Sequence, residues 1–323
     1  NAFESVSSFD KVTKIDQEGV SKILTNLVAN QWTLMPKPPK MSNGHGWGVS
    51  PYDPIRHQLL SFGGGHSSAH YTDITHYSIR SSTWSWGYGE EYPYYNASFS
   101  AMFNQTFKNR PTVPTHVWDS AAFDETTGKA IYCIRGGTWL YDPATREWEY
   151  PPTWNTEGGS FANMKGTPKG VIFWGRGDGR VNGELKLFNN LSKKWEVLPI
   201  KGGGIPVAYG DTGGMCYDSK RDCLWLAHFG APMQRYDMKT GELTQDSSTG
   251  QPENIYMRGT AYIPEIDMLL NVGRVNGPDG QIGNLAYDIQ NKKWVAIQLP
   301  CSDNLPRTNE KPYSEINLDL YYD

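Results

Sequence analysis

At five places in this chain of 323 residues, an aromatic residue is followed seven positions later by tryptophan or, once, by leucine. The five pairs are Tyr77/Trp84, Tyr141/Trp148, Phe188/Trp195, Tyr236/Leu243 and Tyr287/Trp294. Each pair encloses a polar segment, such as SIRSST, DPATRE or DIQNKK, made of residues that favour turns. Apolar residues on both sides of a short polar turn are typical of a β-hairpin, so the chain repeats one hairpin five times.

The spacing of the repeats indicates the fold. The first aromatic residues of successive pairs are 64, 47, 48 and 51 residues apart. A period of about 50 residues built from short strands is typical of a kelch-type propeller blade. The 34 glycines and 21 prolines likewise fit many short strands joined by tight turns. We therefore predict an all-β, kelch-like β-propeller of four-stranded antiparallel blades.

The repeats predict a single domain over residues 1–323 with five complete blades. These blades are expected at about residues 44–86, 114–150, 159–198, 207–245 and 255–298. Residues 310–323 resemble one strand of a further blade, which is either truncated or completed by a strand from the N-terminal region. Residues 1–40 are expected to supply that closing strand and a short helix, because residues 16–30 have apolar positions at helical spacing.

Charge and hydropathy exclude several classes of partner. The formal net charge is −4, so no basic field favours nucleic acid or an anionic membrane surface. No apolar run approaches the roughly 20 residues that a membrane-spanning helix requires. We expect a soluble monomer without nucleic-acid or membrane partners. Because the chain begins with Asn1 and lacks a signal-like apolar stretch, we interpret it as a mature, processed or trimmed product.

Four cysteines are too few for a disulfide scaffold. Cys216 and Cys223 flank the hairpin turn YDSKRD. They either face each other across the two strands or pack as two free thiols.

Candidate site residues occur where a propeller would direct strand ends toward one mouth of its central channel. His45 and His66 lie at the two ends of the first two-strand excursion, and His116 and Arg135 bracket the second in the same way. Corresponding positions of the later repeats hold Arg176, Tyr209, His228, Arg258 and Arg274. The predicted mouth therefore combines imidazoles, guanidiniums and a phenol, and no Walker loop or HExxH motif accompanies them.

Structural roles are open for several of these side chains. His66 follows three glycines, and its side chain could cap that turn by hydrogen bonding. The arginines of the later repeats could stabilise loops by donating hydrogen bonds to backbone carbonyls. His57 is expected to be solvated in its turn, and His76 to have a structural or surface role. Clustered histidines also suit a structural zinc or calcium ion, although the chemistry considered below requires no cofactor.

A long insertion between the first two repeats, residues 86–114, is rich in aromatic residues. Long loops in compact domains tend to carry function. Its aromatic side chains either stack on sugar rings or pack over the face of the propeller. Tyr94 and Tyr95 of this insertion, together with Lys165 of the third repeat, are further candidates for substrate binding.

The segments GHGWG, FGGGHSSAHYTD, THVWDSAAFD and IRGG together resemble the propeller-type ulvan lyases. Those enzymes cleave the sulfated rhamnose–uronate polymer of green algae. The resemblance covers most of the first two repeats, and the later repeats match only as generic blades. It implies a secreted, extracellular or periplasmic enzyme that acts on an anionic algal polysaccharide. The family's propellers usually have seven blades, and this chain is too short for seven complete ones.

The resemblance also implies roles. Arg135 would neutralise the uronate carboxylate, and His45, His66 and His116 would serve as base and acid. The family is expected to carry a tyrosine where this chain has His116, so Tyr209 is our substitute candidate for the acid. Such chemistry is β-elimination: a base removes the C5 proton, an arginine stabilises the developing enolate, and a second group protonates the leaving O4. Contacts with sulfate or a neighbouring uronate would fall to Arg176, Arg258 and Arg274.

Two other functions fit the same fold. A non-catalytic kelch-like propeller that binds carbohydrate or protein requires no convergence of the three histidines. A hydrolase requires a pair of carboxylates at the mouth. Asp119, Asp178 and Asp211 are candidates for that pair, but no spacing in the sequence brings two of them together.

Overall fold

The computed structural model describes only part of the chain. The described residues are 22, 25–26, 49–62, 73–88, 106–107, 110–111, 120–134, 137–149, 163–176, 183–206, 213–228, 231–247, 260–272 and 284–297. The helix expected over residues 16–30 is not seen as an element: in that stretch the structure describes a single backbone hydrogen bond, from Asn26 N–H to the Lys22 carbonyl at 3.2 Å. Within the described ranges, no helix has the length and apolarity needed to cross a membrane.

The described strands form five four-stranded antiparallel sheets, the number of complete repeats expected. The first sheet comprises β1 (Tyr52–Asp53), β2 (Gln58–Phe62), β3 (Ile74–Ser78) and β4 (Thr83–Tyr88). The second comprises β7 (Ala121–Asp124), β8 (Lys129–Ile134), β9 (Gly137–Asp142) and β10 (Glu147–Glu149). The third comprises β11 (Asn163–Thr167), β12 (Gly170–Arg176), β13 (Gly183–Asn189) and β14 (Lys194–Val197). The last two comprise β15 (Gly213–Asp218), β16 (Cys223–His228), β17 (Gln234–Asp237), β18 (Leu243–Gln245); and β19 (Thr260–Ile263), β20 (Met268–Val272), β21 (Asn284–Asp288), β22 (Lys293–Ile297). A small hairpin, β5 (Thr106–Phe107) and β6 (Arg110–Pro111), lies within the insertion.

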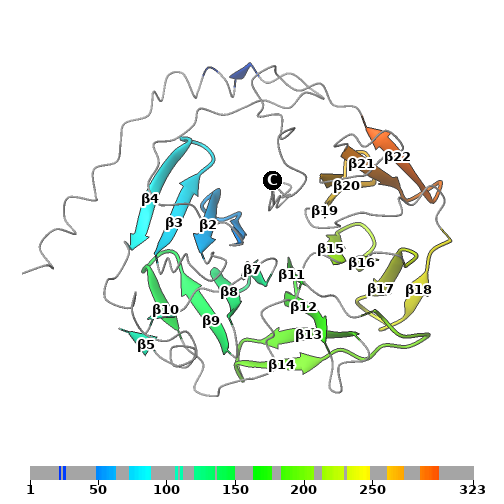
Figure 1. Cartoon of the computed structure of the whole chain (residues 1–323), viewed down its shortest axis with the longest axis horizontal. Coiled ribbons are helices and arrows are strands. Elements are labelled where there is room, and N and C mark those ends of the chain that lie inside the picture. The colour runs from blue at the N-terminus through cyan, green and yellow to red at the C-terminus, as the bar shows by residue number, and fades with distance from the viewer. Residues whose placement is uncertain are drawn as a thin grey trace, which may run out of the picture.

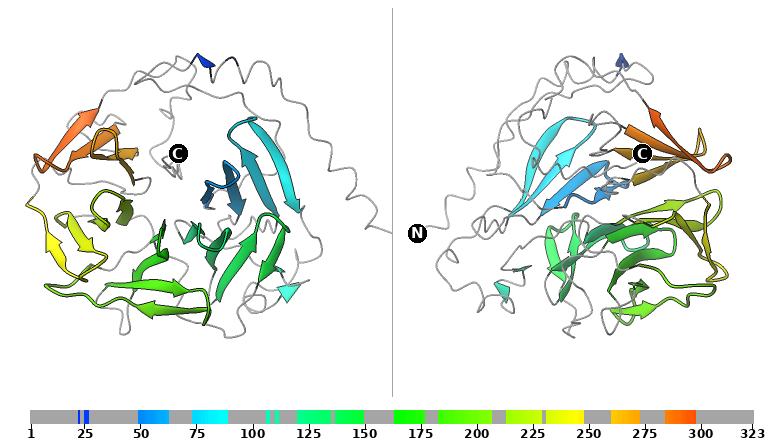
Figure 2. Two further views of the ribbon diagram at one scale, coloured as in Figure 1. Left: turned by 180° about the vertical axis from the view of Figure 1, so that it is seen from behind. Right: turned by 45° about the vertical axis from the view of Figure 1, so that its right-hand side comes forward.

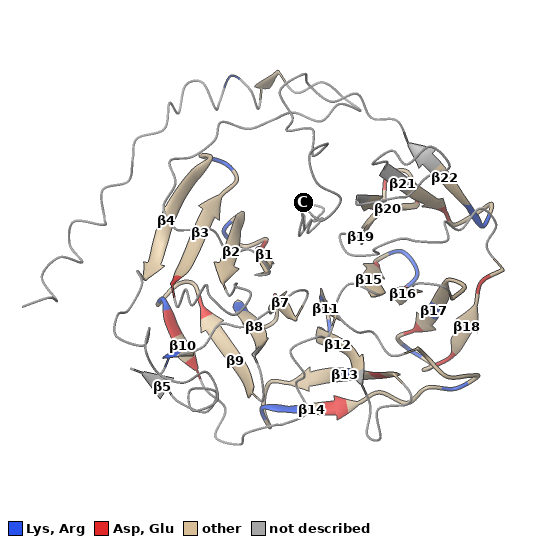
Figure 3. Ribbon diagram, in the orientation of Figure 1, with Lys and Arg blue, Asp and Glu red and all other residues tan. Residues whose placement is uncertain are grey.

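The five sheets follow one another around an arc in chain order (Figure 1). The first strand of each sheet, β1, β7, β11, β15 or β19, lies toward the centre, and the fourth lies on the outside (Figure 3). A view from behind and a view turned by 45° show the same succession of sheets (Figure 2). The arc formed by the described strands is not closed into a ring.

The five aromatic pairs of the sequence are directly opposite each other across the outer hairpin of each sheet. Every pair, from Tyr77/Trp84 to Tyr287/Trp294, is a cross-strand partner in the register. In the four aromatic–aromatic pairs the ring centroids are 5.0 to 5.2 Å apart. Tilted or edge-on ring contacts at this distance stabilise a hairpin beyond their buried area. The seven-residue spacing therefore arises because the two residues occupy facing positions on the third and fourth strands, on either side of a turn of fixed length.

Side chains capping the turns fix that length. In the first, second and fourth sheets, the inner turn starts with a fully buried aspartate, namely Asp53, Asp124 or Asp218. Asp218 Oδ1 accepts the backbone N–H groups two and three residues later, at 3.0 and 3.1 Å. Asp142, Asn189 and Asp237 cap the outer turns in the same manner. This side-chain mimicry of a backbone turn is what favours Asp and Asn at the first position.

The last residue of each four-residue turn adopts the left-handed conformation. Arg146, for example, has φ of 62° and Asp267 has φ of 55°. This conformation closes the hairpin with the twist that the two strands require. Glycine occupies the position once, at Gly128, and the other turns accept the steric cost of a side chain there.

The hydrophobic core consists of four layers, each between two consecutive sheets. Trp148 packs against the first sheet and donates its indole N–H to Tyr88 Oη at 2.7 Å. Trp195 packs against the second sheet and donates to Thr138 Oγ1 at 2.8 Å. Each outer hairpin thus lays its aromatic pair on the preceding sheet. In the first sheet, where no described sheet precedes, Tyr77 and Trp84 are only half-buried.

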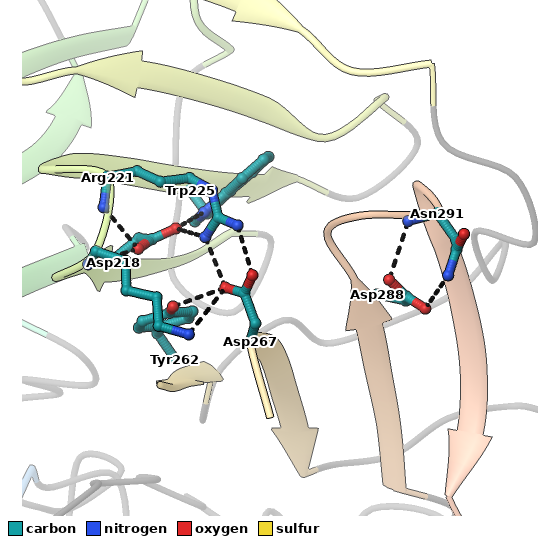
Figure 4. Close-up of polar contacts among 8 residues, drawn as sticks. Asp218, Arg221, Trp225, Tyr262, Asp267, Asp288 and Asn291 are labelled. Carbon is teal, nitrogen blue, oxygen red and sulfur yellow. Dashed lines mark hydrogen bonds and ion pairs between the residues drawn. The ribbon is translucent and has the colours of Figure 1, made fainter. Parts of the chain in front are cut away.

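The turns of neighbouring sheets are tied together by ion pairs. Arg221 binds Asp267 of the fifth sheet through two hydrogen bonds of 2.7 Å and also contacts Asp218 at 2.8 Å (Figure 4). Arg221 and Tyr262 together hold the pKa of Asp267 well below its usual value, because both donate hydrogen bonds to its carboxylate. Lys169 of the third sheet makes the equivalent contact with Asp222 of the fourth sheet at 2.9 Å. Both side chains of this pair are more exposed than Arg221 and Asp267.

We predict different costs for breaking these two ion pairs. Arg221→Met should lower the free energy of unfolding by about 2 kcal/mol, because it removes the bidentate partner of Asp267 and one hydrogen bond to the fully buried Asp218. Lys169→Met should change it by no more than about 0.5 kcal/mol, because exposed ion pairs contribute little. Urea unfolding of both variants measures the difference. Equal effects of the two substitutions would contradict the view that Arg221 stabilises the packing of the fourth sheet against the fifth.

Candidate functional site

The connections between strands divide the molecule into two ends. The first and second strands of each sheet, and the third and fourth, are joined by turns of four residues in most cases. We call the end that holds these turns the turn end. All other connections, between the second and third strands and between successive sheets, leave from the opposite end, which we call the loop end.

Contacts between sheets show that the third, fourth and fifth sheets point the same way. At the loop end, Asn163 at the start of β11 donates its side-chain amide to the Gly213 carbonyl at the start of β15, at 2.9 Å. At the turn end, Arg221 reaches the turn of the next sheet, as described above. The first residues of neighbouring innermost strands therefore meet at one end and the turns meet at the other. Strand ends from different sheets share the loop end as a consequence.

Most of the residues predicted as site residues lie outside the described ranges. They are His45, His66, His116, Arg135, Tyr209, Arg258, Arg274, Tyr94 and Tyr95. The described strand ends nearest to many of them in the chain are at the loop end: Phe62 closes β2 before His66, and Ile134 closes β8 immediately before Arg135. Arg176 is itself the last residue of β12 and pairs with Gly183. The convergence of these side chains on one ligand stays a prediction.

His228 is a predicted mouth residue that the structure describes. It is the last residue of β16, pairs with Gly213 and is half-buried at the loop end. Its ring centroid lies 6.2 Å from that of Trp174 in the third sheet. Trp174 is fixed by a hydrogen bond from its indole N–H to the Pro206 carbonyl at 3.0 Å. An imidazole therefore stands at the loop end between two consecutive sheets, against a fixed aromatic ring.

Two other histidines have structural roles. His76 is buried between the first two sheets, and its Nε2 lies 2.8 Å from Tyr141 Oη. Burial lowers the pKa of His76 to about 4, so the ring is neutral at physiological pH. His57 was expected to be solvated, but it is half-buried and its Nδ1 lies 3.1 Å from Tyr52 Oη. The turn explains this difference, because its left-handed last residue, His57, directs the ring back toward the strand that enters the turn.

The described cysteines are free buried thiols: Cys133, Cys216 and Cys223. Cys216 is opposite Trp225 in the register and Cys223 is opposite Asp218, so the two thiols are diagonal neighbours. Diagonal side chains in a hairpin are farther apart than a disulfide allows. Burial raises the pKa of all three thiols to about 12, which excludes them as nucleophiles at neutral pH.

A cavity of about 300 Å³ is lined by residues of the first strand of all five sheets. Lys165, predicted to bind substrate, is in the middle of β11 and lines this cavity rather than ending a strand at the loop end. Four aromatic or phenolic side chains also line it, namely Tyr52, Phe123, Tyr217 and Tyr262. Sequence reasoning missed their role, although the repeated pattern of an aromatic residue one position before each inner turn was visible in PYD, AFD and CYD.

Charged side chains are distributed unevenly over the sheets. Figure 3 shows acidic and basic residues mainly on the outer strands β10 and β14 and in the turns.

Among the described residues, no group of three or more His, Cys, Asp or Glu side chains is arranged to hold a metal ion. The predicted structural zinc or calcium ion depends on histidines outside the described ranges, so it stays a prediction.

No protein-family model matches this sequence, and no curated protein sequence matches it.

Proposed function

We propose that this chain is a secreted polysaccharide lyase that cleaves ulvan by β-elimination on a kelch-like β-propeller. The observation that carries the proposal is the joint occurrence of GHGWG, FGGGHSSAHYTD, THVWDSAAFD and IRGG in the first two repeats. The topology supports it, because the strand ends that flank His66 and Arg135 belong to the loop end.

The propeller itself is part of this proposal. Five like sheets that pack consecutively, each with its first strand toward the centre, support this proposal because propeller blades have this arrangement. The half-buried pair Tyr77/Trp84 supports a further blade against the first sheet, because the equivalent pairs of the other sheets are each covered by a preceding sheet. A blade built by both chain termini would cover this pair and close the ring.

The proposed reaction needs one cation and two proton-transfer groups. Arg135 pairs with the uronate carboxylate and stabilises the enolate that forms when the C5 proton leaves. A histidine among His45, His66 and His116 takes that proton in its neutral form, and Tyr209 or a second histidine protonates O4. The C4–O4 bond breaks and a C4=C5 double bond forms, giving a 4,5-unsaturated uronate at the new non-reducing end. No step requires a metal ion.

Secondary contacts follow from the same arrangement. We assign Arg176, Arg258 and Arg274 to the sulfate groups or to neighbouring uronates of the polymer, because guanidinium groups bind both anions through paired hydrogen bonds. Tyr94 and Tyr95 are assigned to sugar stacking. We propose that the protein acts as a monomer.

The test is an ultraviolet assay of the purified chain with ulvan. We expect absorbance to rise as unsaturated uronates form, and no rise with ulvan whose carboxyl groups have been reduced to alcohols, because the C5 proton of a reduced sugar is not acidic. If the folded protein gives no rise with ulvan or other uronate polymers across a wide pH range, the lyase proposal is wrong. Retained binding of ulvan in that case would favour the non-catalytic binding propeller.

A further inference from the structure

The fifth sheet has one face that no described sheet covers. Its other face packs against the fourth sheet and buries Tyr262, Leu269, Tyr287 and Trp294. Alternate residues of a strand lie on opposite faces of a sheet. Toward the middle of the sheet, the uncovered face therefore carries the apolar residues Ala261, Ile263, Met268, Leu270, Ala286 and Val295. We call this surface the far face of the fifth sheet.

The burial of Leu270 shows what the far face lacks. Leu270 pairs with Ala261 just as Ile131 pairs with Ala122 in the second sheet. The equivalent residues of the first four sheets are covered by the following sheet and are at most 4% exposed: Leu60, Ile131, Ile172 and Trp225. Leu270 is only half-buried, as are Ile263 and Met268. An apolar surface that is covered in every other sheet is thus left partly open in the fifth.

The inner turn of the fifth sheet is also apolar on this side. Arg221 and Ile266 occupy the same position of their turns, immediately before the left-handed residues Asp222 and Asp267. Arg221 reaches forward to Asp267 in the following sheet. Ile266 is 55% exposed, so the fifth sheet presents an aliphatic side chain where the fourth sheet presents a cation. The partner that fits the far face is therefore apolar.

Residues 314–323, SEINLDLYYD, have the pattern of an innermost strand and lie outside the described residues. Their apolar positions alternate with polar ones over Ile316, Leu318, Leu320 and Tyr322. A strand with this alternation has one apolar face. The pair Tyr322–Asp323 also matches the aromatic–aspartate pairs at the ends of β1, β7 and β15. This segment therefore offers the apolar surface that the far face lacks.

The position of this segment along the chain fits the place after β19. The aspartate that ends an innermost strand follows the tryptophan of the preceding sheet by 40 positions at Trp84/Asp124 and by 23 at Trp195/Asp218. The corresponding spacing from Trp294 to Asp323 is 29 positions. The innermost strands β7, β11, β15 and β19 are neighbours in chain order. A connection of this length is therefore sufficient to bring residues 314–323 beside β19.

The packing of the other sheets indicates which side chains would meet. The aromatic residue before the inner turn packs on the preceding sheet: Phe123 shares a core layer with Leu60, and Tyr262 shares one with Trp225. Leu60 and Trp225 are the equivalents of Leu270. By the same geometry, Tyr322 is expected over Leu270, with Leu320 and Leu318 on the same side of the strand.

We propose that residues 314–323 form an innermost strand whose apolar face packs on the far face of the fifth sheet of the same chain. The alternation, the aromatic–aspartate pair and the spacing from Trp294 all select this segment as the partner. The contact concerns the fifth sheet and does not depend on the proposed lyase activity.

Amide hydrogen exchange of the whole chain tests this contact, with mass spectrometry of proteolytic fragments that contain residues 316–322. We expect these amides to exchange at least about tenfold more slowly than in a synthetic peptide of the same sequence, because a packed strand is protected. Leu270→Ser should raise their exchange rate about tenfold or more, since it removes an apolar contact of the strand. Leu320→Ser should have the same effect from the other side of the contact.

Leu59→Ser is the matched control for Leu270→Ser. Leu59 is also half-buried, and it pairs with Tyr77 on the face of the first sheet that no described sheet covers. Asp319→Ser is the control for Leu320→Ser, because residue 319 belongs to the polar face of the expected strand. Neither control should change the exchange of residues 316–322. Unfolding midpoints verify that each variant is folded.

Three results would overturn the proposal. In the first, residues 316–322 of the unmodified chain exchange as fast as the synthetic peptide. In the second, the controls raise the exchange rate as much as Leu270→Ser and Leu320→Ser do. In the third, protection appears only when the protein concentration is raised, which would show that a second copy of the chain supplies the partner.

Discussion

Replacing Arg135 by alanine is expected to lower the initial rate of ulvan cleavage by about 100-fold or more. Removing one group that stabilises a developing oxyanion costs about this much in other enzymes. In β-elimination the uronate carboxylate is the group that takes up the charge, and Arg135 is its proposed partner. Arg135→Lys should give an intermediate rate, because lysine keeps the charge but loses the bidentate geometry. Ultraviolet assays at saturating ulvan measure all three rates.

Arg80→Ala is the control for this experiment. Arg80 is exposed in the outer turn of the first sheet, at the turn end, so its loss changes the net charge equally without touching the loop end. Its rate should stay within about twofold of that of the unmodified chain. His66→Ala tests the second part of the site and should also lose most activity. Full activity in both Arg135→Ala and His66→Ala would refute the site assignment, even if the chain is a lyase.

Acid should destabilise the fold through His76 by about 3 kcal/mol between pH 7 and pH 4. Burial lowers the pKa of this imidazole from 6.5 to about 4, with a further contribution from the nearby Arg146. Asp53 opposes the shift, and Arg56 adds to it weakly. As the pH falls below 6.5, the unfolded chain takes up a proton that the folded chain does not. Unfolding is therefore favoured progressively until the pH reaches about 4.

His76→Gln isolates this contribution, because glutamine can keep a hydrogen bond to Tyr141 but does not titrate in this range. Free energies of unfolding, measured at pH 7 and pH 4, should fall less in His76→Gln than in the unmodified chain by the amount stated above. Tyr141→Phe removes the hydroxyl partner and keeps the buried imidazole, so its acid sensitivity should persist. An identical pH dependence in His76→Gln and the unmodified chain would show that His76 is not the titrating group.

The hairpins were predictable because they depend on residues close together in the chain. The Tyr141/Trp148 spacing encodes two strand positions around a turn of fixed length, and the register confirms it. Asp142 at the first turn position encodes the cap that holds that turn. Such contacts involve only residues within one hairpin, so they can be predicted from the local sequence. The helix predicted over residues 16–30 rested on apolar spacing alone, and it is not seen.

The candidate site was less predictable because it depends on how the sheets are placed. The sequence suggested that Tyr209 and His228 bracket one two-strand excursion. The register pairs His228 with Gly213 at the loop end, and Tyr209 lies outside the described residues. It did not indicate that Trp174 of the preceding sheet would lie beside His228. It also gave no reason to separate Lys165 from the loop-end arginines. That separation follows from the position of Lys165 in the middle of an innermost strand.

The sequence by itself determined an all-β chain of repeated hairpins, their register and their turn chemistry, because these are set by local spacing and by capping side chains. Only the tertiary structure decided which residues of different sheets meet. It brought His76 against Tyr141, Arg221 against Asp267, and Lys165 to the lining of the central cavity. The physical reason is that packing between sheets joins residues about 50 positions apart, and no local pattern specifies which of them face each other.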